Sequence, residues 1–472
     1  MPPLVATILY LSIAIYLFQR DVRQPTTATG ALWLPFLWMF ISGSRFISQW
    51  LAIFGINVGA ANASVEEGSP IDALFFLVLI VWAFYILFRR RVSLQEFIHR
   101  NRWVTFYLLF CLLAISWSDF QFVAFKRWIK LFGQPVMVLI LLTEPDPLES
   151  ISRMMKRCAC FWMPISLLFI NYFPNLGRGF DPWSGQPSDN GIAGNKNSLG
   201  CDCLILGLFF CWHFLRVWAR DKGRARRDEL ILCAGFIAVI GWLVHLAQSS
   251  TSLATLVLGS AIMVIVSRKS IDRRRIGVNL AAILIIAGLV DYMFGIHKLI
   301  IHALGRNETL TGRTEIWDIL RHWDLNPLIG VGYETFWLGP RVDKIESMIP
   351  GLILNEAHNG YLETYINMGL LGLVVTLTLL VNTYLKIQRL MVNNFDFARY
   401  RLAYLIVFIA YNWTETAFRT HAVPFFMFFL IAIDYPYRTL TQENARNITT
   451  TPEPVSPARP LIQTAQWRQA EV

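Results

Sequence analysis

Long apolar runs, separated by short polar segments, recur along most of the chain. Each run is about 15 to 20 residues long, and a helix needs roughly 20 residues to cross the hydrocarbon layer of a membrane. The pattern therefore predicts an all-α, polytopic membrane protein with about 12 to 13 transmembrane helices. The expected spans cover residues 4–18, 31–54, 71–88, 103–117, 128–143, 158–173, 199–218, 229–247, 251–267, 276–294, 366–385, 402–412 and 422–434.

Basic residues are concentrated in alternate segments between these runs. By the positive-inside rule, such segments face the cytoplasm. About thirteen spans leave the amino terminus outside and the carboxyl terminus inside; if residues 4–18 only lie on the membrane, about twelve spans leave both termini inside. The segments expected in the cytoplasm are 89–102, 154–157, 216–227, 268–275 and 386–401, and those expected outside are 55–70, 118–127, 174–198, 295–365 and 413–421.

The composition agrees with a membrane protein, because 55% of the residues are hydrophobic and only 16% are charged. One soluble domain could not bury so much apolar surface. The net charge of +10 is explained by the basic cytoplasmic segments, so nucleic acid is not an expected partner. The first apolar run lacks a basic leader and an obvious cleavage site, which indicates a retained helix rather than a removed signal.

The chain divides into four parts on this pattern. Residues 1–190 form amino-terminal transmembrane helices, and residues 191–385 form a core that includes one large outward loop, 295–365, with short helices in it. Residues 386–434 form the carboxyl-terminal helices. Residues 435–472 are rich in Thr, Pro, Gln and Arg without apolar periodicity, which predicts a disordered cytoplasmic tail.

The sequence predicts neither a metal nor a cofactor. The seven cysteines lie in or at the ends of apolar runs, where thiols usually pack as small hydrophobic groups. Cys158 and Cys160 are expected at one membrane face, and Cys201 and Cys203 near the other, so the two pairs should not share a metal ion. No pair of histidines has zinc-binding spacing, and no P-loop, dinucleotide or Gly-x-Ser-x-Gly motif is apparent.

One histidine stands at the junction between the large polar loop and a membrane span. In the step Ala357-His358-Asn359-Gly360, an imidazole lies beside an amide and a glycine, just before residues 364–385, which carry no charge. Two interpretations are open. His358 and Asn359 either cap the transmembrane helix, or His358 is a titratable group with a chemical use at the membrane surface.

The outward loop contains the segment TEIWDILRHW, which predicts an amphipathic helix with Ile316, Leu320 and Trp323 on one face. Such a helix should lie on the membrane or on the helix bundle. Arg313 is at its start, next to Gly312. A basic side chain together with free amide hydrogens at that position would suit a phosphate.

Two further polar segments flank apolar runs on the outward side. Lys196 stands between Asn195 and Asn197 at the start of a run, where it could bind an anion or could simply extend toward the membrane surface. Across the next hairpin, residues 248–252 have the sequence QSSTS. Helix capping and hydrogen bonding to a substrate both explain this hydroxyl cluster.

Some outward basic residues contradict the charge rule. Lys126, Arg127 and Lys130 are of this kind, and positive charge against the topological bias often faces an anionic ligand or a lipid head group. Arg419, in the last outward segment, is similar. A helical ion pair between Glu415 and Arg419 explains that arginine equally well.

These elements, in this order, resemble the O-antigen ligase and polymerase superfamily of membrane proteins. The pattern HN-x9-G, with another glycine three residues on, runs as His358, Asn359, Gly369 and Gly372, and the two glycines are expected to allow close helix packing beneath the histidine. GRTEIW followed by PLIGVG is similar to the family's loop arginine and glycine step. GNKNSLG resembles its lysine–asparagine motif, and QSSTSLATL its serine–threonine hairpin.

One departure points to a branch of the superfamily. The ligases often have leucine four residues after the loop arginine, whereas Trp317 stands there in this chain, which looks closer to the exopolysaccharide polymerases. The resemblance implies a GT-C-like membrane enzyme of the bacterial inner membrane. Such an enzyme transfers or polymerises oligosaccharide units linked to polyprenyl diphosphate at the periplasmic face, with inversion and without a metal, in exopolysaccharide or O-antigen biosynthesis.

The resemblance also suggests residue roles that suit the chemistry. His358 is the expected general base, since an imidazole with an ordinary pKa near 6.5 is largely neutral at pH 7. Arg313 and Lys196 are expected to bind the diphosphate, with Arg127 and Arg419 as further candidates, and Arg313 is expected to be catalytic. The expected partners are the lipid-linked glycan, a glycan or lipid acceptor, membrane lipids and other polysaccharide assembly proteins.

Three alternatives remain at this point. The protein could be an O-antigen ligase that joins the glycan to lipid A core. It could be a flippase or transporter of lipid-linked glycans, although the sequence shows no internal repeat and no obvious pair of broken helices. It could also be a scaffold of an envelope assembly complex, which would tolerate changes at His358 and Arg313.

Overall fold

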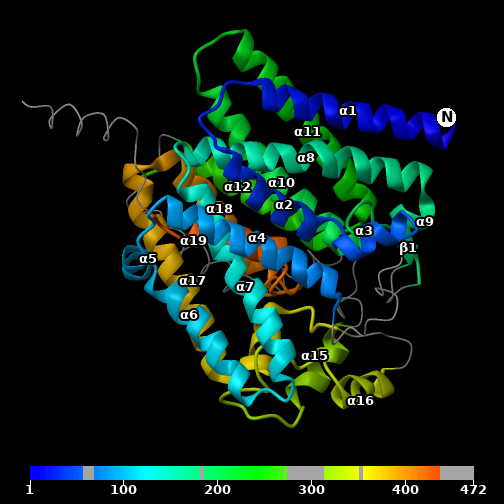
Figure 1. Cartoon of the computed structure of the whole chain (residues 1–472), viewed down its shortest axis with the longest axis vertical. Coiled ribbons are helices and arrows are strands. Elements are labelled where there is room, and N and C mark those ends of the chain that lie inside the picture. Colours follow the sequence, from blue (N-terminus) through cyan, green and yellow to red (C-terminus); the bar gives the residue numbers. More distant parts are fainter. Residues whose placement is uncertain (57–67, 181–184, 269–270, 274–312, 350–354, 436–472) are drawn as a thin grey trace, which may run out of the picture.

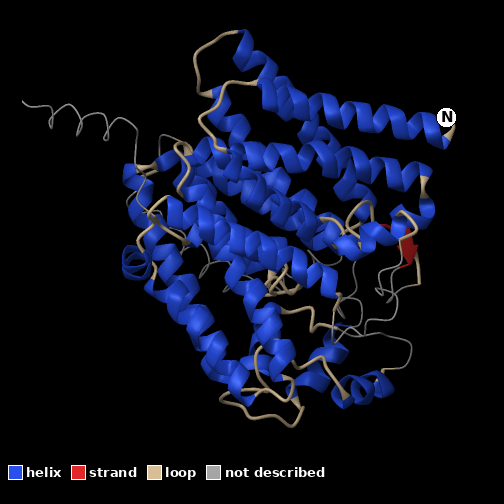
Figure 2. Cartoon of the chain, viewed as in Figure 1, coloured by secondary structure: helices blue, strands red, loops and turns tan. Residues whose placement is uncertain are grey.

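The structure is a computed structural model that describes residues 1–56, 68–180, 185–268, 271–273, 313–349 and 355–435. Within these ranges nearly all regular structure is helical, as Figure 2 shows. One short antiparallel hairpin joins β1 (Arg178–Phe180) to β2 (Pro187–Asp189). The predicted all-α class is therefore confirmed.

Each expected span within the described residues contains a helix (Figure 1). The expected span 276–294 and the tail beyond residue 435 lie outside the described residues. The helices are α1 (Pro3–Arg23), η1 (Gly30–Leu32), α2 (Trp33–Gly43), α3 (Ile47–Ile53), α4 (Pro70–Arg89), α5 (Leu94–Arg100), α6 (Arg102–Leu113), η2 (Ala114–Trp117), α7 (Gln121–Leu142), α8 (Pro147–Tyr172), α9 (Pro174–Gly177), α10 (Lys196–Trp218), α11 (Arg224–Ala247), α12 (Ser250–Val266), α15 (Arg313–Arg321), α16 (Pro340–Met348), α17 (Gly360–Asn393), α18 (Phe395–Tyr411) and α19 (Val423–Ala432).

Several of these helices suit a bilayer. Among the described residues, five helices, α1, α4, α10, α11 and α17, are long and apolar enough to cross a membrane, or up to six if η1 and α2 form one bent span with α3. Shorter apolar helices, among them α12 and α19, pack with them. The chain is thus an all-α, polytopic membrane protein.

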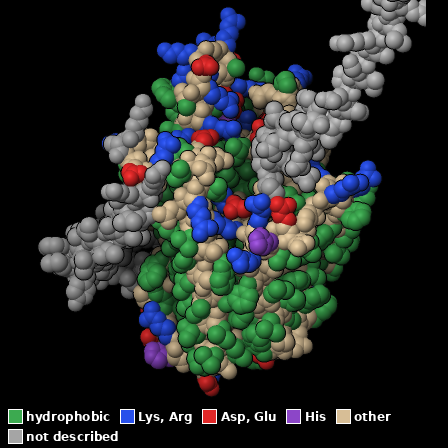
Figure 3. Space-filling view, turned by 90° about the vertical axis from the view of Figure 1, so that its left-hand side faces the viewer, with side chains coloured by type: hydrophobic (Ala, Val, Ile, Leu, Met, Phe, Trp, Pro, Cys, Tyr) green, Lys and Arg blue, Asp and Glu red, His purple; other side chains and the backbone are tan. Residues whose placement is uncertain are grey.

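The segments that the charge rule groups together meet at two ends of the bundle. At one end Asp434 pairs with Arg401 at 2.9 Å, and the side-chain amide of Asn101 donates to the Asp434 carbonyl. At the other end Arg341 pairs with Asp119 at 2.7 Å. Figure 3 views the left-hand side of Figure 1, and charged side chains gather in its upper and middle parts above a hydrophobic area. Each contact joins segments that the charge rule places in one group, while the side of the membrane that each group faces stays a prediction.

The expectation of a basic loop at residues 154–157 is wrong, because these residues lie inside α8. Their charges are buried but paired: Arg157 contacts Asp21 of α1 at 2.8 Å, and Lys156 contacts Glu229 of α11 at 3.1 Å. Buried charges of both signs hold α1, α8 and α11 together where each would be costly alone. Because α8 begins at Pro147, Cys158 lies within this helix and not at its start, while its place relative to the membrane face stays a prediction.

The amino-terminal helix α1 runs antiparallel to α8. Ala6, near its start, packs against Leu168 and Phe169 near the end of α8, whereas Asp21, near its end, reaches Arg157. The start of α1 therefore lies on the same side of the molecule as α9 and β1 (Figure 1). This arrangement favours the count in which residues 4–18 cross the membrane.

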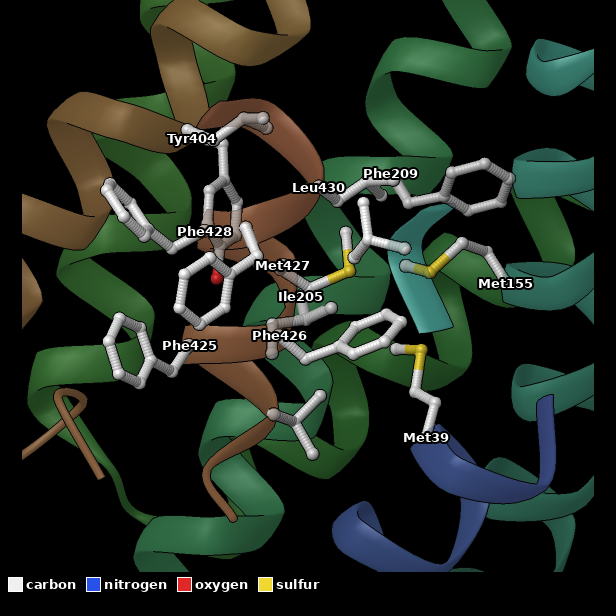
Figure 4. Packing of buried hydrophobic residues seen from close by; sticks show 14 of the residues in the cluster. Met39, Met155, Ile205, Phe209, Tyr404, Phe425, Phe426, Met427, Phe428 and Leu430 are labelled. Carbon is white, nitrogen blue, oxygen red and sulfur yellow. The ribbon is translucent and has the colours of Figure 1, made fainter. Parts of the chain in front are cut away.

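The apolar core is built around α19. All ten residues of this helix are buried, which fits a helix that is hydrophobic on every side. In Figure 4 its side chains Phe426 and Met427 lie among Met39 of α2, Met155 of α8 and Ile205 of α10. The tight interior fixes the positions of the segments that precede and follow α19, including residues 412–422.

Within the described residues the helices break at two places, neither of which was obvious in the sequence. The first separates the span of η1 and α2 from α3, which bend by 66°. Arg45 lies in this break and its guanidinium donates to the Leu176 carbonyl, which gives a charged side chain a partner between the two helices. The break leaves Ser42, Gly43 and Ser44 at the open end of α2.

The second break lies inside α17, at Gly369, whose φ of 64° and ψ of −166° are not helical. Residues 327–332 enter this break, and Gly330, with a φ of 65°, faces it. Backbone bonds from the loop replace those that the helix loses, as a membrane helix requires. These bonds run from Leu370 N to Pro327 O (2.9 Å), Leu371 N to Leu328 O (3.0 Å), Val331 N to Ile366 O (3.2 Å) and Gly332 N to Asn367 O (2.8 Å).

The glycines of the HN-x9-G pattern therefore serve this break and not close helix packing as expected. A Cβ atom at Gly369 would lie 2.2 Å from the carbonyl carbon of Leu328, and one at Gly372 would lie 2.2 Å from the Cβ of Met368 in its own helix. Both contacts are far inside van der Waals distance. Gly330 of the loop and Gly369 of the helix thus allow the two backbones to pack directly against each other, an arrangement called the interlock below.

The large loop carries a small apolar core of its own. Ile316 and Leu320 of α15 are buried against Phe336, Ile345 of α16 and Ile366 of α17. The amphipathic helix predicted at TEIWDILRHW is confirmed as α15. Its apolar face packs on α16 and on the start of α17, at the bottom of Figure 1.

Replacing Gly369 by alanine should lower the free energy of unfolding by about 2 kcal/mol or more, because the new side chain meets the loop and the residue keeps a positive φ. The unfolding temperature of the purified protein in detergent measures this. Gly241→Ala in α11 is the control, since nothing lies within 4 Å of a Cβ atom there. Equal melting of the two variants would contradict the interlock.

Candidate functional site

A polar cavity of about 580 Å³ lies at the end of the bundle that carries the segments expected outside. Its walls come from the end of α2, the β1–β2 hairpin, the start of α10, residues 355–358 and the segment between α18 and α19. Three of the five predicted site residues line it, namely His358, Lys196 and Arg419. The structure thus brings together residues that lie far apart in the chain.

His358 and Asn359 have different roles. Asn359 is the N-cap of α17, and its side chain accepts hydrogen bonds from the amides of Tyr361 and Leu362. His358 is not the cap. It has a left-handed backbone with a φ of 48°, which is uncommon outside glycine, and its side chain, 13% exposed, lines the cavity. The capping interpretation therefore holds for Asn359 only.

The unusual backbone of His358 is held by its neighbour Ala357. The Ala357 amide donates to the Glu363 carboxylate at 2.8 Å, and the Ala357 carbonyl accepts from the Trp317 indole at 2.8 Å. Trp337 donates to the same carboxylate at 2.9 Å. Trp317, which marks the departure from the ligases, thus fixes the peptide next to the histidine.

Glu415 is the residue on which three predicted motifs converge. Its carboxylate pairs with Arg313 at 2.8 Å, lies 3.7 Å from Nδ1 of His358 and accepts from the Asn197 amide at 3.5 Å. The Arg313 guanidinium also donates to the Thr414 carbonyl. Arg313 therefore lies behind Glu415 and does not line the cavity.

Glu356 and Arg419 form a second ion pair in the cavity, 3.0 Å apart. The other oxygen of Glu356 lies 3.2 Å from Nδ1 of His358. The helical pair between Glu415 and Arg419 that the sequence allowed is not formed, because residues 412–422 lie between α18 and α19. Glu415 pairs with Arg313 instead, and Arg419 pairs with Glu356.

The charges around His358 alter its proton affinity. Burial alone would lower the pKa of His358, but Glu356 and Glu415 outweigh it and raise this pKa above its ordinary value. Burial likewise opposes ionisation of Glu415, but Arg313 and His358 prevail and lower the pKa of that carboxyl group. The two carboxylates thus make His358 easier to protonate than an ordinary imidazole.

A second histidine of the cavity behaves in the opposite way. Burial and then Arg419, Lys130 and Arg127 lower the pKa of His421 well below its ordinary value, so that this imidazole is neutral. Its ring also contacts Phe46 with the ring centroids 5.6 Å apart. One cavity thus holds two imidazoles whose environments push their pKa values apart.

The remaining predicted residues have distinct positions. Lys196 begins α10 and lines the cavity, next to Asn195, which caps that helix by accepting from the Ser198 amide. Arg127 lies within α7, which begins earlier than expected, and its guanidinium donates to the Glu334 carbonyl. Arg127 does not line the cavity, although it is among the charges that act on His421.

The hydroxyl cluster at residues 248–252 packs against segments that form the cavity wall. Thr251 exchanges a hydrogen bond with Thr414 at 2.9 Å, and Ser249 packs where a Cβ atom on Gly200 would lie, 2.5 Å away. Neither side chain lines the cavity. The hairpin thus positions the residue next to Glu415 and the start of α10.

Oxygen and nitrogen atoms of Glu356, His358 and Glu415 lie within 4.8 Å of one another, a spacing that could hold a metal ion. Each of the two carboxylates, however, already faces a guanidinium, from Arg419 and Arg313 respectively. A divalent cation would add further positive charge beside two arginines that already neutralise these carboxylates. The charges therefore agree better with a metal-free site, which stays a prediction.

A second group of possible ligands lies on α10 and α11, where His213, Glu229 and Cys233 approach within the same 4.8 Å. Glu229 is already engaged by Nε2 of His213 at 2.9 Å and by Lys156 at 3.1 Å. This cluster joins α8, α10 and α11, and the contacts of Glu229 with His213 and Lys156 explain why these side chains lie close together.

The sequence-based prediction names Glu415 only as a possible partner of Arg419, and it does not include Glu356 or Asp202. Glu356 stands two residues before His358, and Glu415 lies in the polar segment NWTETAFRTHA between two apolar runs. Asp202 is a single carboxyl group inside an apolar run, which is a rare and often functional arrangement in membrane helices. Each signal was visible in the sequence, but the partner of each residue was not.

These features define a multi-pass helical membrane protein with a polar site at one end of its bundle, where an imidazole, two carboxylates and several cations meet. Residues 230–377 match the family model described as O-antigen ligase, a range that includes Arg313 and His358. The predicted resemblance to this superfamily is confirmed over that range.

One similar protein is the exopolysaccharide production protein ExoQ of Rhizobium meliloti (strain 1021). It is 25% identical over 308 residues, which cover 62% of this chain and 67% of the relative. Together with the helical membrane architecture, the two matches support a membrane protein of the O-antigen ligase or polymerase type in polysaccharide biosynthesis.

The raised pKa of His358 predicts a pH-dependent contribution to stability. The histidine binds its proton more tightly in the folded protein, so this contribution is present below about pH 6.5 and is lost as the pH rises through the folded pKa. The unfolding temperature of His358→Gln should therefore fall furthest below that of wild type at acidic pH. His322→Gln, at an exposed position, is the control, and a difference that is independent of pH would contradict the charged pair.

Proposed function

We propose that the protein is a membrane glycosyltransferase of the periplasmic face of the bacterial inner membrane. It transfers or polymerises oligosaccharide units linked to polyprenyl diphosphate in exopolysaccharide or O-antigen biosynthesis. The observation that carries this proposal is the cavity in which His358, paired with two carboxylates, shares one space with Lys196 and Arg419. The similarity to an exopolysaccharide production protein supports it.

The residues suit a direct displacement. An acceptor hydroxyl oxygen forms a bond to the anomeric carbon of the lipid-linked glycan, while the bond from that carbon to the diphosphate oxygen breaks. The electron pair leaves with the polyprenyl diphosphate, and the hydroxyl proton passes to His358. Lys196 and Arg419 line the cavity and supply positive charge for the departing diphosphate.

Glu356 and Glu415 assist His358 in its role as the base. They stabilise the imidazolium that forms when His358 accepts the proton, as a carboxylate does in other histidine-based catalytic groups. The same carboxylates raise the pKa of His358, so the neutral base becomes available toward higher pH. Arg313 lies behind Glu415, and its geometry suits the positioning of this carboxylate better than direct contact with the diphosphate.

A ligase that transfers the glycan to lipid A core would use the same steps with a different acceptor. Trp317 and the similarity to the exopolysaccharide production protein favour polymerisation. The flippase alternative gains one specific observation, the broken helices at α2 and at Gly369. The second break is filled by backbone bonds from residues 327–332, which suits a fixed site better than a moving gate.

Replacing His358 by alanine should reduce transfer by about a hundredfold or more, since a positioned base contributes that much. Purified wild type with lipid-linked glycan in detergent should release polyprenyl diphosphate and form longer glycan without a membrane gradient. A flippase would release none. If His358→Ala keeps wild-type rates while His421→Ala loses them, the role of base belongs to the second imidazole.

Arg313→Ala should be nearly as severe as His358→Ala, because it leaves Glu415 buried without its arginine. Arg313→Lys keeps the charge but cannot span both Glu415 and the Thr414 carbonyl, so activity should be restored only in part. A positioning role also predicts an altered pH profile of the rate in Arg313→Lys. Full activity with an unchanged pH profile would contradict this role.

Activity should persist after dialysis against EDTA, because two arginines already neutralise the carboxylates around His358. The rate of polyprenyl diphosphate release, measured with EDTA and then with added Mg²⁺ or Mn²⁺, tests this. Loss of activity with EDTA and recovery with one of these ions would show that Glu356, His358 and Glu415 hold a metal ion.

A further inference from the structure

We propose that Asp202 of α10, with Ser42 at the broken end of α2, forms a subsite that binds sugar hydroxyl groups of the glycan. This inference rests on the proposed function, because it names the part of the substrate that one wall of the same cavity recognises. It adds a specificity-determining residue to a site whose other charged groups serve the proton and the diphosphate.

The first observation is an unsatisfied carboxyl group. Asp202 is only 2% exposed, it lines the cavity, and its Oδ2 atom has no hydrogen-bond partner among the described residues. A buried polar atom without a partner destabilises a fold, because it loses its hydrogen bonds to water. Such an atom in a native structure needs an explanation, and here the carboxyl group borders a space large enough for a ligand.

Two hydroxyl groups of the same cavity share this property. The Oγ atom of Ser42 and the Oγ1 atom of Thr416 are also buried without a hydrogen-bond partner in the described part of the chain, and both residues line the cavity. Hydroxyl and carboxyl groups both donate or accept hydrogen bonds according to the partner. This set matches the hydroxyl groups of a sugar, each of which is a donor and an acceptor.

The architecture of the wall explains how Asp202 reaches the cavity. Gly43 stands where α2 ends, and a Cβ atom there would lie 3.0 Å from Oδ1 of Asp202 and 2.3 Å from the ring of Trp162. The glycine thus lets α2 approach α10 directly beside the carboxyl group. Because α2 breaks off at this point, Ser42 and Ser44 line the cavity next to Asp202 and do not continue into a membrane helix.

The position along α10 separates this subsite from the diphosphate. Asp202 lies six residues after Lys196, which corresponds to about 9 Å along the helix axis. Lys196 attracts an anion, whereas the buried carboxyl group of Asp202 offers an anion no positive charge. Asp202 therefore faces an uncharged part of the substrate, and a sugar hydroxyl fits both its hydrogen-bonding groups and its place.

Asp202→Asn tests the subsite with little change in shape. The variant should raise the KM for one glycan substrate about tenfold or more, since a site built to bind a hydroxyl loses much affinity when its partner is altered. Two kinetic series show whether that hydroxyl belongs to the donor or to the acceptor.

The first series varies the concentration of the lipid-linked donor. The second varies the concentration of the acceptor, for which short oligosaccharides are prepared by mild acid hydrolysis of the organism's own polysaccharide.

The unfolding temperature distinguishes substrate binding by Asp202 from a purely structural role, because a structural role predicts that Asp202→Asn lowers this temperature. Because Oδ2 has no partner among the described residues, Asp202→Asn should leave the unfolding temperature unchanged or raise it. Asp72→Asn is the matched control. Asp72 is also buried, at 6% exposure, but its carboxylate accepts from the amide and the hydroxyl of Ser48 at 2.9 and 2.6 Å, so this variant should melt earlier with unchanged KM values.

Binding of the same oligosaccharides should raise the unfolding temperature of wild type and Asp72→Asn, but not that of Asp202→Asn. The subsite is overturned if Asp202→Asn keeps both KM values and the oligosaccharide shift, or if it melts as early as Asp72→Asn with unchanged KM values. If wild type releases no polyprenyl diphosphate at all, the proposed function fails instead. The two failures are therefore distinguishable.

Discussion

The carboxylate of Glu415 is the interaction on which the site depends. It meets Arg313 from the large loop, His358 from the segment before α17 and Asn197 from the start of α10. These residues come from three separate parts of the chain, and Glu415 comes from a fourth. Since a buried carboxylate is costly without such partners, the same contacts that satisfy its charge also assemble the cavity.

A series of backbone hydrogen bonds connects the large loop and α17 to the peptide beside His358. The break of α17 at Gly369 receives residues 327–332, which anchors the large loop on the helix. The loop core then presents Trp317 to the Ala357 carbonyl, while Glu363 of α17 holds the Ala357 amide. Both hydrogen-bonding groups of one peptide are thereby fixed, which sustains the left-handed backbone of His358. Packing of the loop and orientation of the imidazole are therefore coupled.

The cavity combines two kinds of wall. One carries paired charges around His358, with Lys196 and Arg419 as the cations that line the space. The other, at the break of α2, carries hydroxyl groups and Asp202. A lipid-linked glycan has the same division, with a charged diphosphate and neutral sugars. The sugar subsite proposed above lies at the second wall, where Oδ2 of Asp202 and Oγ of Ser42 are buried without a hydrogen-bond partner among the described residues.

The membrane class and the approximate positions of the described helices follow from the sequence alone, and so does the choice of His358 as a candidate, because apolar periodicity and charge sidedness are local properties. Only the tertiary structure decided that Glu415 pairs with Arg313 and not with Arg419, and that Gly369 admits a loop and not a helix. Those outcomes depend on which distant segments meet, and apolar patterning does not specify that. Neighbouring charges then shift the two histidines in opposite directions: two carboxylates outweigh burial and raise the pKa of His358, whereas burial and nearby cations lower the pKa of His421.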